Sequence, residues 1–253
     1  MRATERLSAQ FEGARFPLFT AATARENGAM SQEQWTAVDR YITDLLVPSD
    51  PALESTLRAS VEGGLPAINV APNQGKFLAM LAQIQKAQNI LEIGTLGGYS
   101  TIWLARALSA GGRLITLEAD PAHANVARAN IANAGLAGVV DLRLGPALET
   151  LPQIAAEGLG PFDFIFIDAD KPAYPEYFEW AMKLSKRGSL IIADNIIRQG
   201  GVIDPNHEDP RVHGVRRFNE LVAAEPRVSA TAIQTVGSKG YDGFVMALVI
   251  AEP

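Results

Sequence analysis

Carboxylate, amide and amine side chains follow two apolar runs in the second half of the chain. Asp168 ends one run, Lys171 follows three residues later, and Asp194 and Asn195 end the next run. If both runs are neighbouring parallel strands, their carboxyl ends meet at one edge of a sheet. Two carboxylates and an amide oxygen are hard ligands, which suit Mg²⁺ first and Mn²⁺ or Ca²⁺ as alternatives. The pattern therefore predicts a divalent-cation site formed by Asp168, Asp194 and Asn195.

Lys171 is the candidate general base of that site. A cation beside a lysine disfavours the protonated amine, and the neutral amine can accept a proton from a hydroxyl. A vicinal diol on the metal would have its own acidity raised by the Lewis acid. Zinc is a poor match, because the chain has no cysteine and its histidines, expected at the surface, show no ligand spacing. These histidines are His123, His207 and His213.

A glycine-rich turn follows the first strand-like run and is the candidate cofactor loop. It reads G-x-x-G-G from Gly94 to Gly98, and Leu96 takes the place at which dinucleotide folds bring a glycine to the pyrophosphate. Glu92, before the turn, suits a cationic amino group, and Glu118, at the next strand end, can accept ribose hydroxyls. A ribose without phosphate beside an ammonium group describes S-adenosylmethionine (SAM). The alternative is that Glu92 caps a helix and Glu118 is a solvated strand end.

Short apolar runs alternate with helical stretches after residue 88. Strands are expected at 89–93, 113–118, 139–144, 162–168 and 188–193, and helices at 99–109, 121–134, 146–156 and 174–184. This alternation predicts βαβ units and a parallel sheet with both faces covered. A helix at 210–224 precedes two strand-like runs, 227–236 and 243–250, that could pair at one edge.

The chain before residue 88 reads as helical. Ser31 opens a helix with a capping box, Asp50-Pro51 opens a second helix that ends at Gly63, and a third helix is expected at 73–86. No linker or repeat interrupts the sequence. The prediction is one domain over residues 1–253, in which 1–64 form an N-terminal arm and helices.

The composition and charge of the chain argue against several classes of protein. The net charge is −6 and no block of Lys or Arg occurs, which argues against a nucleic-acid partner. No apolar run approaches the roughly 20 residues of a membrane helix, and no signal peptide is expected. We expect a cytoplasmic protein with no membrane partner.

The ordered set of motifs resembles the cation-dependent O-methyltransferases of the catechol and caffeoyl-CoA type, especially the bacterial branch. The resemblance runs from about residue 69 to the C-terminus. Its marks are Gln74-Gly75-Lys76-Phe77-Leu78, Leu91-Glu92-Ile93-Gly94 with Gly98-Tyr99-Ser100, Gly145-Pro146-Ala147-Leu148, Phe166-Ile167-Asp168-Ala169-Asp170-Lys171 and Asp194-Asn195. It implies a doubly wound, mostly parallel α/β sheet of seven strands, in the order 3-2-1-4-5-7-6 with the last strand antiparallel.

The resemblance also implies an activity and a role for each matching residue. The activity is transfer of the SAM methyl group to a hydroxyl of a phenolic small molecule, by an enzyme that is typically a homodimer. The metal ligands would be Asp168, Asp194 and Asn195, with Lys171 as base and Asp168 also near the methyl donor, so that Lys171 and Asp168 are the catalytic pair. Cofactor contacts would fall at Val70, Glu92, Gly94, Ser100, Glu118, Ala147 and Asp168.

Two departures and two alternatives remain. Leu96 stands where the catechol branch carries a tyrosine over the cofactor, and Ala169 stands where it has histidine. Segments 196–211 and 237–243 should line the acceptor pocket, but the sequence does not name the acceptor. An NAD-dependent oxidoreductase or a non-catalytic cofactor-binding protein on a similar fold are the alternatives; Leu96 in the glycine turn and the set of metal ligands argue against them.

Overall fold

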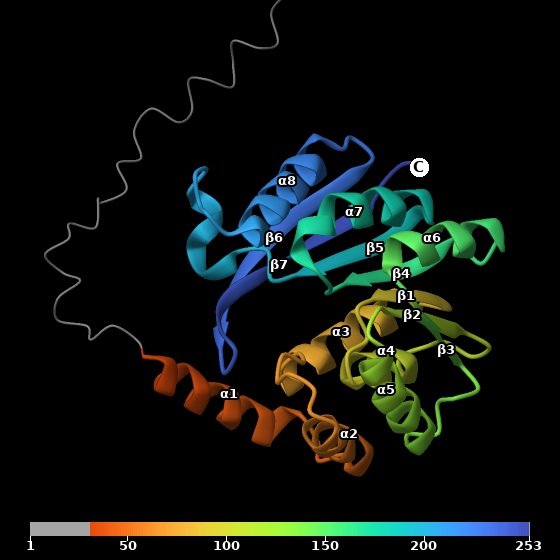
Figure 1. Ribbon diagram of the computed structural model, residues 1–253, viewed down its shortest axis with the longest axis vertical. Coiled ribbons are helices and arrows are strands. Elements are labelled where there is room, and N and C mark those ends of the chain that lie inside the picture. The colour runs from red at the N-terminus through yellow and green to blue at the C-terminus, as the bar shows by residue number, and fades with distance from the viewer. Residues whose placement is uncertain (1–30, 253) are drawn as a thin grey trace, which may run out of the picture. The chain divides into compact units, whose positions relative to one another are not determined.

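The computed structural model describes residues 31–252, and Gln32–Pro253 form one compact unit. The part of the predicted arm at 1–30 lies outside the described residues. One sheet has the strand order β3-β2-β1-β4-β5-β7-β6, with β7 antiparallel to both neighbours, so the predicted topology is confirmed (Figure 1). The strands are β1 Asn89–Ile93, β2 Arg113–Glu118, β3 Val140–Leu144, β4 Phe162–Ile167, β5 Ser185–Asp194, β6 Val228–Gly237 and β7 Gly240–Val249.

Eight α-helices surround this sheet in the part of the chain that the structure describes. They are α1 Gln32–Leu46, α2 Pro51–Glu62, α3 Pro72–Ile84, α4 Tyr99–Arg106, α5 Pro121–Asn133, α6 Ala147–Ala156, α7 Tyr174–Lys183 and α8 Pro210–Ala224. Helices α2, α5 and α8 begin where an aspartate side chain accepts backbone N–H groups and a proline follows it. The predicted helix start at Asp50-Pro51 and the predicted start at residue 121 of the helix at 121–134 are therefore confirmed.

The strands bury side chains on both faces, because successive residues of a strand point to opposite sides. Leu91 and Ile93 of β1 pack in a cluster with residues of α6, α7 and α8, whereas Ile90 packs with residues of α2, α3 and α4. Glu92 therefore faces the same side as Ile90. The Glu92 side chain therefore points toward the helices that cover this face, α2, α3 and α4.

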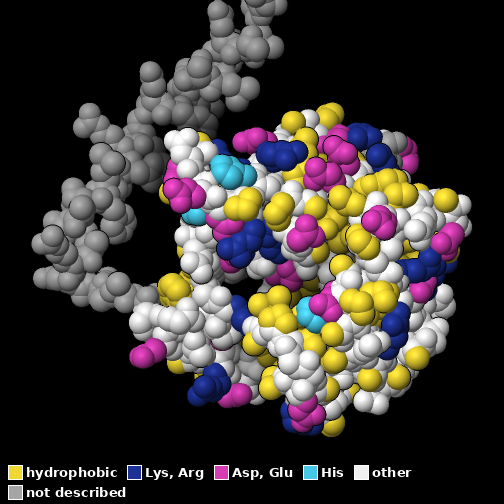
Figure 2. Space-filling model, viewed as in Figure 1, with side chains coloured by type: hydrophobic (Ala, Val, Ile, Leu, Met, Phe, Trp, Pro, Cys, Tyr) yellow, Lys and Arg dark blue, Asp and Glu magenta, His cyan; other side chains and the backbone are white. Residues whose placement is uncertain are grey.

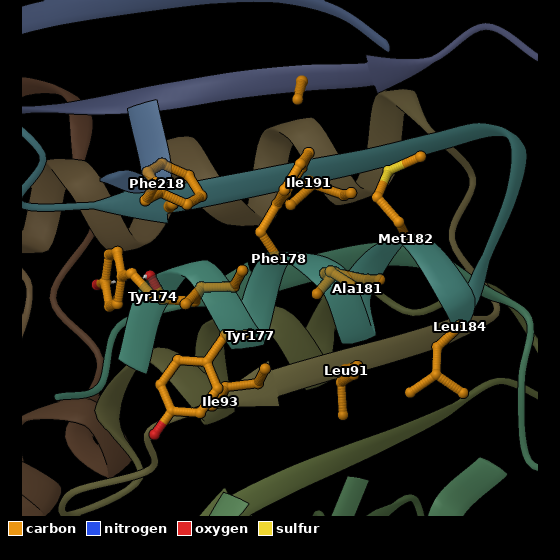
Figure 3. Packing of buried hydrophobic residues seen from close by; sticks show 14 of the residues in the cluster. Leu91, Ile93, Tyr174, Tyr177, Phe178, Ala181, Met182, Leu184, Ile191 and Phe218 are labelled. Carbon is orange, nitrogen blue, oxygen red and sulfur yellow. Dashed lines mark hydrogen bonds between the residues drawn. The ribbon is translucent and has the colours of Figure 1, made fainter. Parts of the chain in front are cut away.

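Helix α7 joins the sheet to α8 through aromatic side chains. Figure 3 shows Tyr174, Tyr177 and Phe178 of α7 near Leu91, Ile93 and Ile191 of the sheet. The rings of Tyr174 and Phe178 each meet Phe218 of α8 edge to face, with centroids 5.5 and 5.7 Å apart. Such aromatic contacts favour one fixed geometry, so α7 is held firmly where it follows the Asp168 strand end.

Strand β5 is longer than the predicted run at 188–193. It begins at Ser185, and its register against β4 shifts between Phe162 and Phe164. Ser189 donates a hydrogen bond to the Phe162 carbonyl at 2.6 Å and accepts one from the Lys186 amide at 2.9 Å. The polar stretch Lys186-Arg187-Gly188, which resembles a turn in sequence, is accommodated as an irregularity inside the strand.

Helix α1 attaches through polar contacts and buries none of its side chains. Asp39 accepts hydrogen bonds from the Ser238 amide at 2.7 Å, in the β6–β7 turn, and from the Asn73 side chain at 3.0 Å, in α3. Four apolar side chains of α1 are exposed: Val38, Tyr41, Leu45 and Leu46.

Charged side chains of both signs are interspersed with apolar ones on the face of the molecule in Figure 2. Within residues 31–252, no helix combines the length and the apolar character needed to cross a membrane.

Candidate active site

A cavity of about 740 Å³ lies at the carboxyl ends of β2, β1, β4 and β5, which are consecutive in the sheet. Neighbouring strands are about 4.8 Å apart, so these ends span roughly 14 Å. The predicted site residues that line the cavity are Val70, Gly94, Ser100, Glu118, Ala147, Asp168, Lys171 and Asn195. Glu92 and Asp194 are buried beside it and are not part of its lining.

Gly94 lets the ends of β1 and β4 come into contact. Its φ is 103°, and a Cβ atom there would lie 2.0 Å from the carbonyl oxygen of Asp168. The Asp168 amide in turn donates to the Ile93 carbonyl at 2.9 Å. Only glycine fits this position. The glycine-rich turn at 94–98 and the end of β4 at Asp168 are therefore packed directly together.

Glu118 is fixed at the other end of the same turn. One carboxylate oxygen accepts the Leu96 amide at 2.8 Å, and the other accepts the Asp120 amide at 2.9 Å. His123 lines the cavity with Nδ1 3.5 Å from Glu118, which corrects its expected surface position. A carboxylate offers about four lone-pair sites, so Glu118 can still accept hydroxyl groups from a ligand in the cavity.

Glu92 faces helix α4 and is fully buried. It accepts hydrogen bonds from the hydroxyls of Ser100 and Thr116, both at 2.7 Å, and from the hydroxyl of Thr101. Burial raises the pKa of Glu92 to about 7, against the opposing effect of these hydroxyls. Among these partners, Ser100 lines the cavity, so Ser100 lies between the Glu92 carboxylate and the cavity.

Glu92 should make stability fall with rising pH. Its pKa rises from 4.5 to about 7 on folding, so the folded protein keeps a proton that the unfolded chain releases. The stabilisation is complete below pH 4.5 and is lost as the pH rises through 7, by about 3 kcal/mol. We expect Glu92→Gln, which cannot titrate, to gain this amount relative to the wild type between about pH 4.5 and 8.

Urea unfolding of both proteins in EDTA at several pH values measures this difference. Other titrating groups, including Asp194, contribute equally to both proteins and cancel. Parallel curves of unfolding free energy against pH would contradict the protonated, buried state of Glu92.

Lys171 is held between Asp168 and a buried tyrosine. Its Nζ lies 2.8 Å from an Asp168 carboxylate oxygen and donates to the Tyr174 hydroxyl at 2.6 Å. That hydroxyl lies 2.9 Å from the Asp194 carbonyl oxygen, to which it can donate. Gly214 of α8 packs closely here, since a Cβ on it would lie 2.3 Å from the Lys171 carbonyl oxygen. Tyr174 thus links the candidate base to the strand end that carries the metal-ligand candidates.

The Asp194 carboxylate is buried and held from two sides. One oxygen accepts the Asn195 amide at 2.9 Å, and the other accepts the side-chain amide of Gln74 at 2.7 Å. Burial, and next the negative charge of Asp168, raise the pKa of Asp194 to about 7, while Lys171 acts in the opposite direction. Gln74 comes from α3, 120 residues earlier in the chain.

The donor set at this end of the cavity fits a hard cation. Asp168 and Asn195 line the cavity, and the charges of Asp168 and Asp194 oppose each other. A cation bound between them would remove that repulsion and favour the ionised Asp194. Within residues 31–252 no group of three His, Cys, Asp or Glu side chains could hold a metal, so a site here depends on the amide oxygen of Asn195.

The two segments expected to line the acceptor pocket differ in position. Arg198 and Arg211, from segment 196–211, line the cavity, whereas no residue of segment 237–243 does. Lys239 of the latter donates instead to the Ala67 carbonyl at 3.0 Å, and Ser238 contacts α1. Two aromatic side chains of α7, Tyr174 and Trp180, do not line the cavity. Tyr174 is buried in the core, and the Trp180 ring lies beneath Lys183 Nζ at 4.6 Å.

Known proteins share this fold and sequence. A family model described as O-methyltransferase matches residues 46–249. The chain is 56% identical over 220 residues to a catechol O-methyltransferase of Niastella koreensis, covering 87% of this chain and 100% of the relative. It is 50% identical over 212 residues to a catechol O-methyltransferase of Mycobacterium tuberculosis, covering 84% and 94%.

A solved structure gives the same result in three dimensions. It is the O-methyltransferase from Bacillus cereus in complex with S-adenosylhomocysteine (SAH), at 62% identity and a TM-score of 0.86, covering 87% of this chain and 100% of that one. These matches confirm the enzyme class predicted from the sequence over the oxidoreductase alternative. The chain belongs to the O-methyltransferase family.

Proposed function

We propose that the protein transfers the methyl group of SAM to one hydroxyl of a vicinal-diol phenol and that the transfer requires a divalent cation. One observation carries the proposal. Asp168, Lys171 and Asn195 line the same cavity as Glu118 and residues 94–97 of the glycine-rich turn. The names of the relatives, catechol O-methyltransferases, support a phenolic acceptor.

The cofactor is assigned to the β1–β2 side of the cavity. Glu118 would accept the ribose hydroxyls, while Gly94, Ser100 and Val70 would contact the methionyl part. Ala147 would contact the remaining, adenosine part. Glu92 would act through Ser100 rather than by direct contact, because its oxygens face the hydroxyls of α4 and β2.

Each residue at the reacting end has a task. A cation held by Asp168, Asp194 and Asn195, best Mg²⁺ and otherwise Mn²⁺ or Ca²⁺, would supply Lewis acidity and a template for the diol. Lys171 Nζ accepts the hydroxyl proton, and the resulting ammonium is stabilised by Asp168 and Tyr174. Gln74 and the Asn195 amide hold the Asp194 carboxylate in place. Catalysis then consists mainly of positioning and deprotonation.

Glu118→Gln should weaken cofactor binding. The substitution removes the charge from the hydrogen bonds to ribose, each worth about 1.5–3 kcal/mol, so Kd for SAM should rise roughly tenfold to a hundredfold. Titration calorimetry with SAH measures this change. Glu157→Gln is the matched control, because that exposed carboxylate pairs with Arg143 outside the cavity. Equal Kd values for the wild type and Glu118→Gln would remove Glu118 from the cofactor site.

We propose that the active form is a homodimer. The apolar side chains on α1 that the described residues leave exposed, such as Tyr41 at 67% and Leu45 at 65%, provide a surface for a second copy. Sedimentation equilibrium of the wild type and of Tyr41→Asp tests this. A monomeric wild type would contradict the proposal.

The function is tested by SAH release from SAM with a panel of vicinal-diol phenols, with Mg²⁺ and again with EDTA. Release should need both the diol and the metal, and monohydroxy phenols of the same size should remain unmethylated. Turnover that is undiminished in EDTA would contradict the metal assignment. Turnover of monohydroxy phenols at the same rate would contradict the diol.

A further inference from the structure

Arg198 stands out at the end of the cavity beyond β5. Its φ is 53° and that of Gln199 is 56°, in the left-handed region that costs a side-chain-bearing residue energy. Asp242 holds this segment by accepting the amides of Ile197 at 2.9 Å and Arg198 at 3.1 Å. The backbone is therefore fixed in a strained conformation that places the Arg198 side chain in the cavity lining.

The Arg198 guanidinium is partly buried and lacks a hydrogen-bond partner among the described residues. Its side chain is 21% exposed, its Nε–H is buried without an acceptor, and its nearest carboxylate, Asp242, lies 3.9 Å from Nη1. By contrast, Arg211 donates to both Asp209 oxygens at 2.9 and 3.0 Å. Leaving a buried N–H donor such as this Nε–H without an acceptor is costly. An anionic group of a ligand in the cavity would supply that acceptor.

The position of Arg198 indicates which ligand would carry that anion. The strand ends run from β2 through β1 and β4 to β5, and Arg198 follows β5. It is thus on the far side of Asp168 and Asn195 from Glu118, which is the proposed ribose contact. The other charged groups here are already paired: Lys171 with Asp168, and Arg211 with Asp209. Arg198 is the most loosely paired of these three cations, because Asp242 lies 3.9 Å from its Nη1, and it lies on the acceptor side of the cavity rather than on the cofactor side.

We infer that the methyl acceptor is a catechol whose ring substituent ends in a carboxylate and that Arg198 binds this carboxylate. The inference rests on the proposed function, because it names the acceptor class of the same site. A planar guanidinium matches a carboxylate with two parallel hydrogen bonds. A cavity of about 740 Å³ that also holds the cofactor suits a compact acid. A catechol with a cationic side chain is repelled at the same place.

The test compares three acceptors of equal length: 3-(3,4-dihydroxyphenyl)propionate, its carboxamide and 3-(3,4-dihydroxyphenyl)propylamine. Wild-type kcat/KM should favour the acid over the amide roughly tenfold to a hundredfold, as charge-assisted hydrogen bonds would, with the amine lowest. Arg198→Met should bring the acid-to-amide ratio close to one. Arg217→Met is the matched control, because Arg217 also lies 3.9 Å from a carboxylate, that of Glu176, but is exposed and outside the cavity lining.

Each outcome decides the matter. Equal wild-type rates for the acid and the amide would overturn the inference and leave metal-dependent catechol methylation standing. An acid preference that survives in Arg198→Met would remove Arg198 as its cause. The coenzyme A thioester of the same acid is assayed as a fourth acceptor. A strong preference for this thioester over the free acid would show that a phosphate, not a carboxylate, is recognised, and would overturn the inference. If none of the three is methylated, the proposed function fails as well. Wild-type ratios need no variant to fold, so they test the acceptor class alone.

Discussion

Asp168→Ala should lower kcat by about 10³-fold and weaken Mg²⁺ binding. The carboxylate is assigned to the cation, and it also lies 2.8 Å from Lys171 Nζ. Removing it takes away one charged metal ligand, and the ammonium that Lys171 becomes on accepting the hydroxyl proton loses its counter-ion. The measurement is turnover at saturating SAM and acceptor over a Mg²⁺ titration, so that the loss of metal affinity and the loss of rate are obtained separately.

Asp141→Asn is the control for a general effect of removing a carboxylate. Asp141 is exposed and pairs with Arg143 outside the cavity lining, so both the rate and the Mg²⁺ dependence should stay at wild-type values. If Asp168→Ala keeps most of its turnover at the same Mg²⁺ concentration, the result would contradict the assignment of Asp168 as a metal ligand.

Lys171→Met should lower kcat by roughly 10²–10⁴-fold, the usual contribution of a positioned general base. Methionine keeps the length and apolar stem of the buried side chain but cannot accept a proton. SAM affinity should change little, because the cofactor is assigned to the other side of Asp168. The rate loss is measured with catechol and with 4-nitrocatechol, whose hydroxyl ionises more readily. A missing base should cost less with the more acidic acceptor.

This comparison separates proton transfer from a structural role. A purely structural defect would slow both acceptors by the same factor, and that result would point to another base. Lys183→Met serves as the control, since Lys183 lies over the Trp180 ring on α7 and outside the cavity that holds Lys171.

Much of the fold follows from local patterns in the sequence. The aspartate–proline pairs at 50–51 and 120–121 mark helix starts because the side chain caps free amides, and the structure shows this at both. Periodicity cannot say which strands are neighbours, so the strand order came from the resemblance alone. The start of β5 at Ser185 was missed because Gly188 inside the strand looks like a turn.

The site was predictable where it depends on strand ends. Glu118, Asp168 and Asn195 lie at the cavity because parallel strands deliver their last residues to one edge. The same rule does not predict in which direction a side chain points. The Glu92 carboxylate points toward α4 and does not line the cavity. The contact between Gln74 and Asp194 could not be predicted from the sequence, because the two residues are 120 positions apart and no spacing rule connects them.

The Arg198 Nε–H, which is buried without an acceptor among the described residues, and the buried hydroxyl of Tyr174 show a further limit of prediction from the sequence. Their roles depend on which partners are absent or buried, and these are properties of packing rather than of residue type. His123 is similar, since it reads as a surface helix residue and lines the cavity because α5 starts directly after Glu118.

The contact between Gly94 and the Asp168 carbonyl has a consequence for how such an enzyme can diversify. The cofactor turn and the Asp168 strand end touch through backbone, with no side chain between them to exchange. Substitutions that retune cofactor affinity there must also displace the reacting end, so these two properties evolve together and under strong constraint. The segment at Arg198 is held instead by Asp242 of β7, which accepts the amides of Ile197 and Arg198. New acceptor preferences can therefore arise by changing that segment while the methyl-transfer machinery stays intact, and directed evolution of the enzyme should begin there.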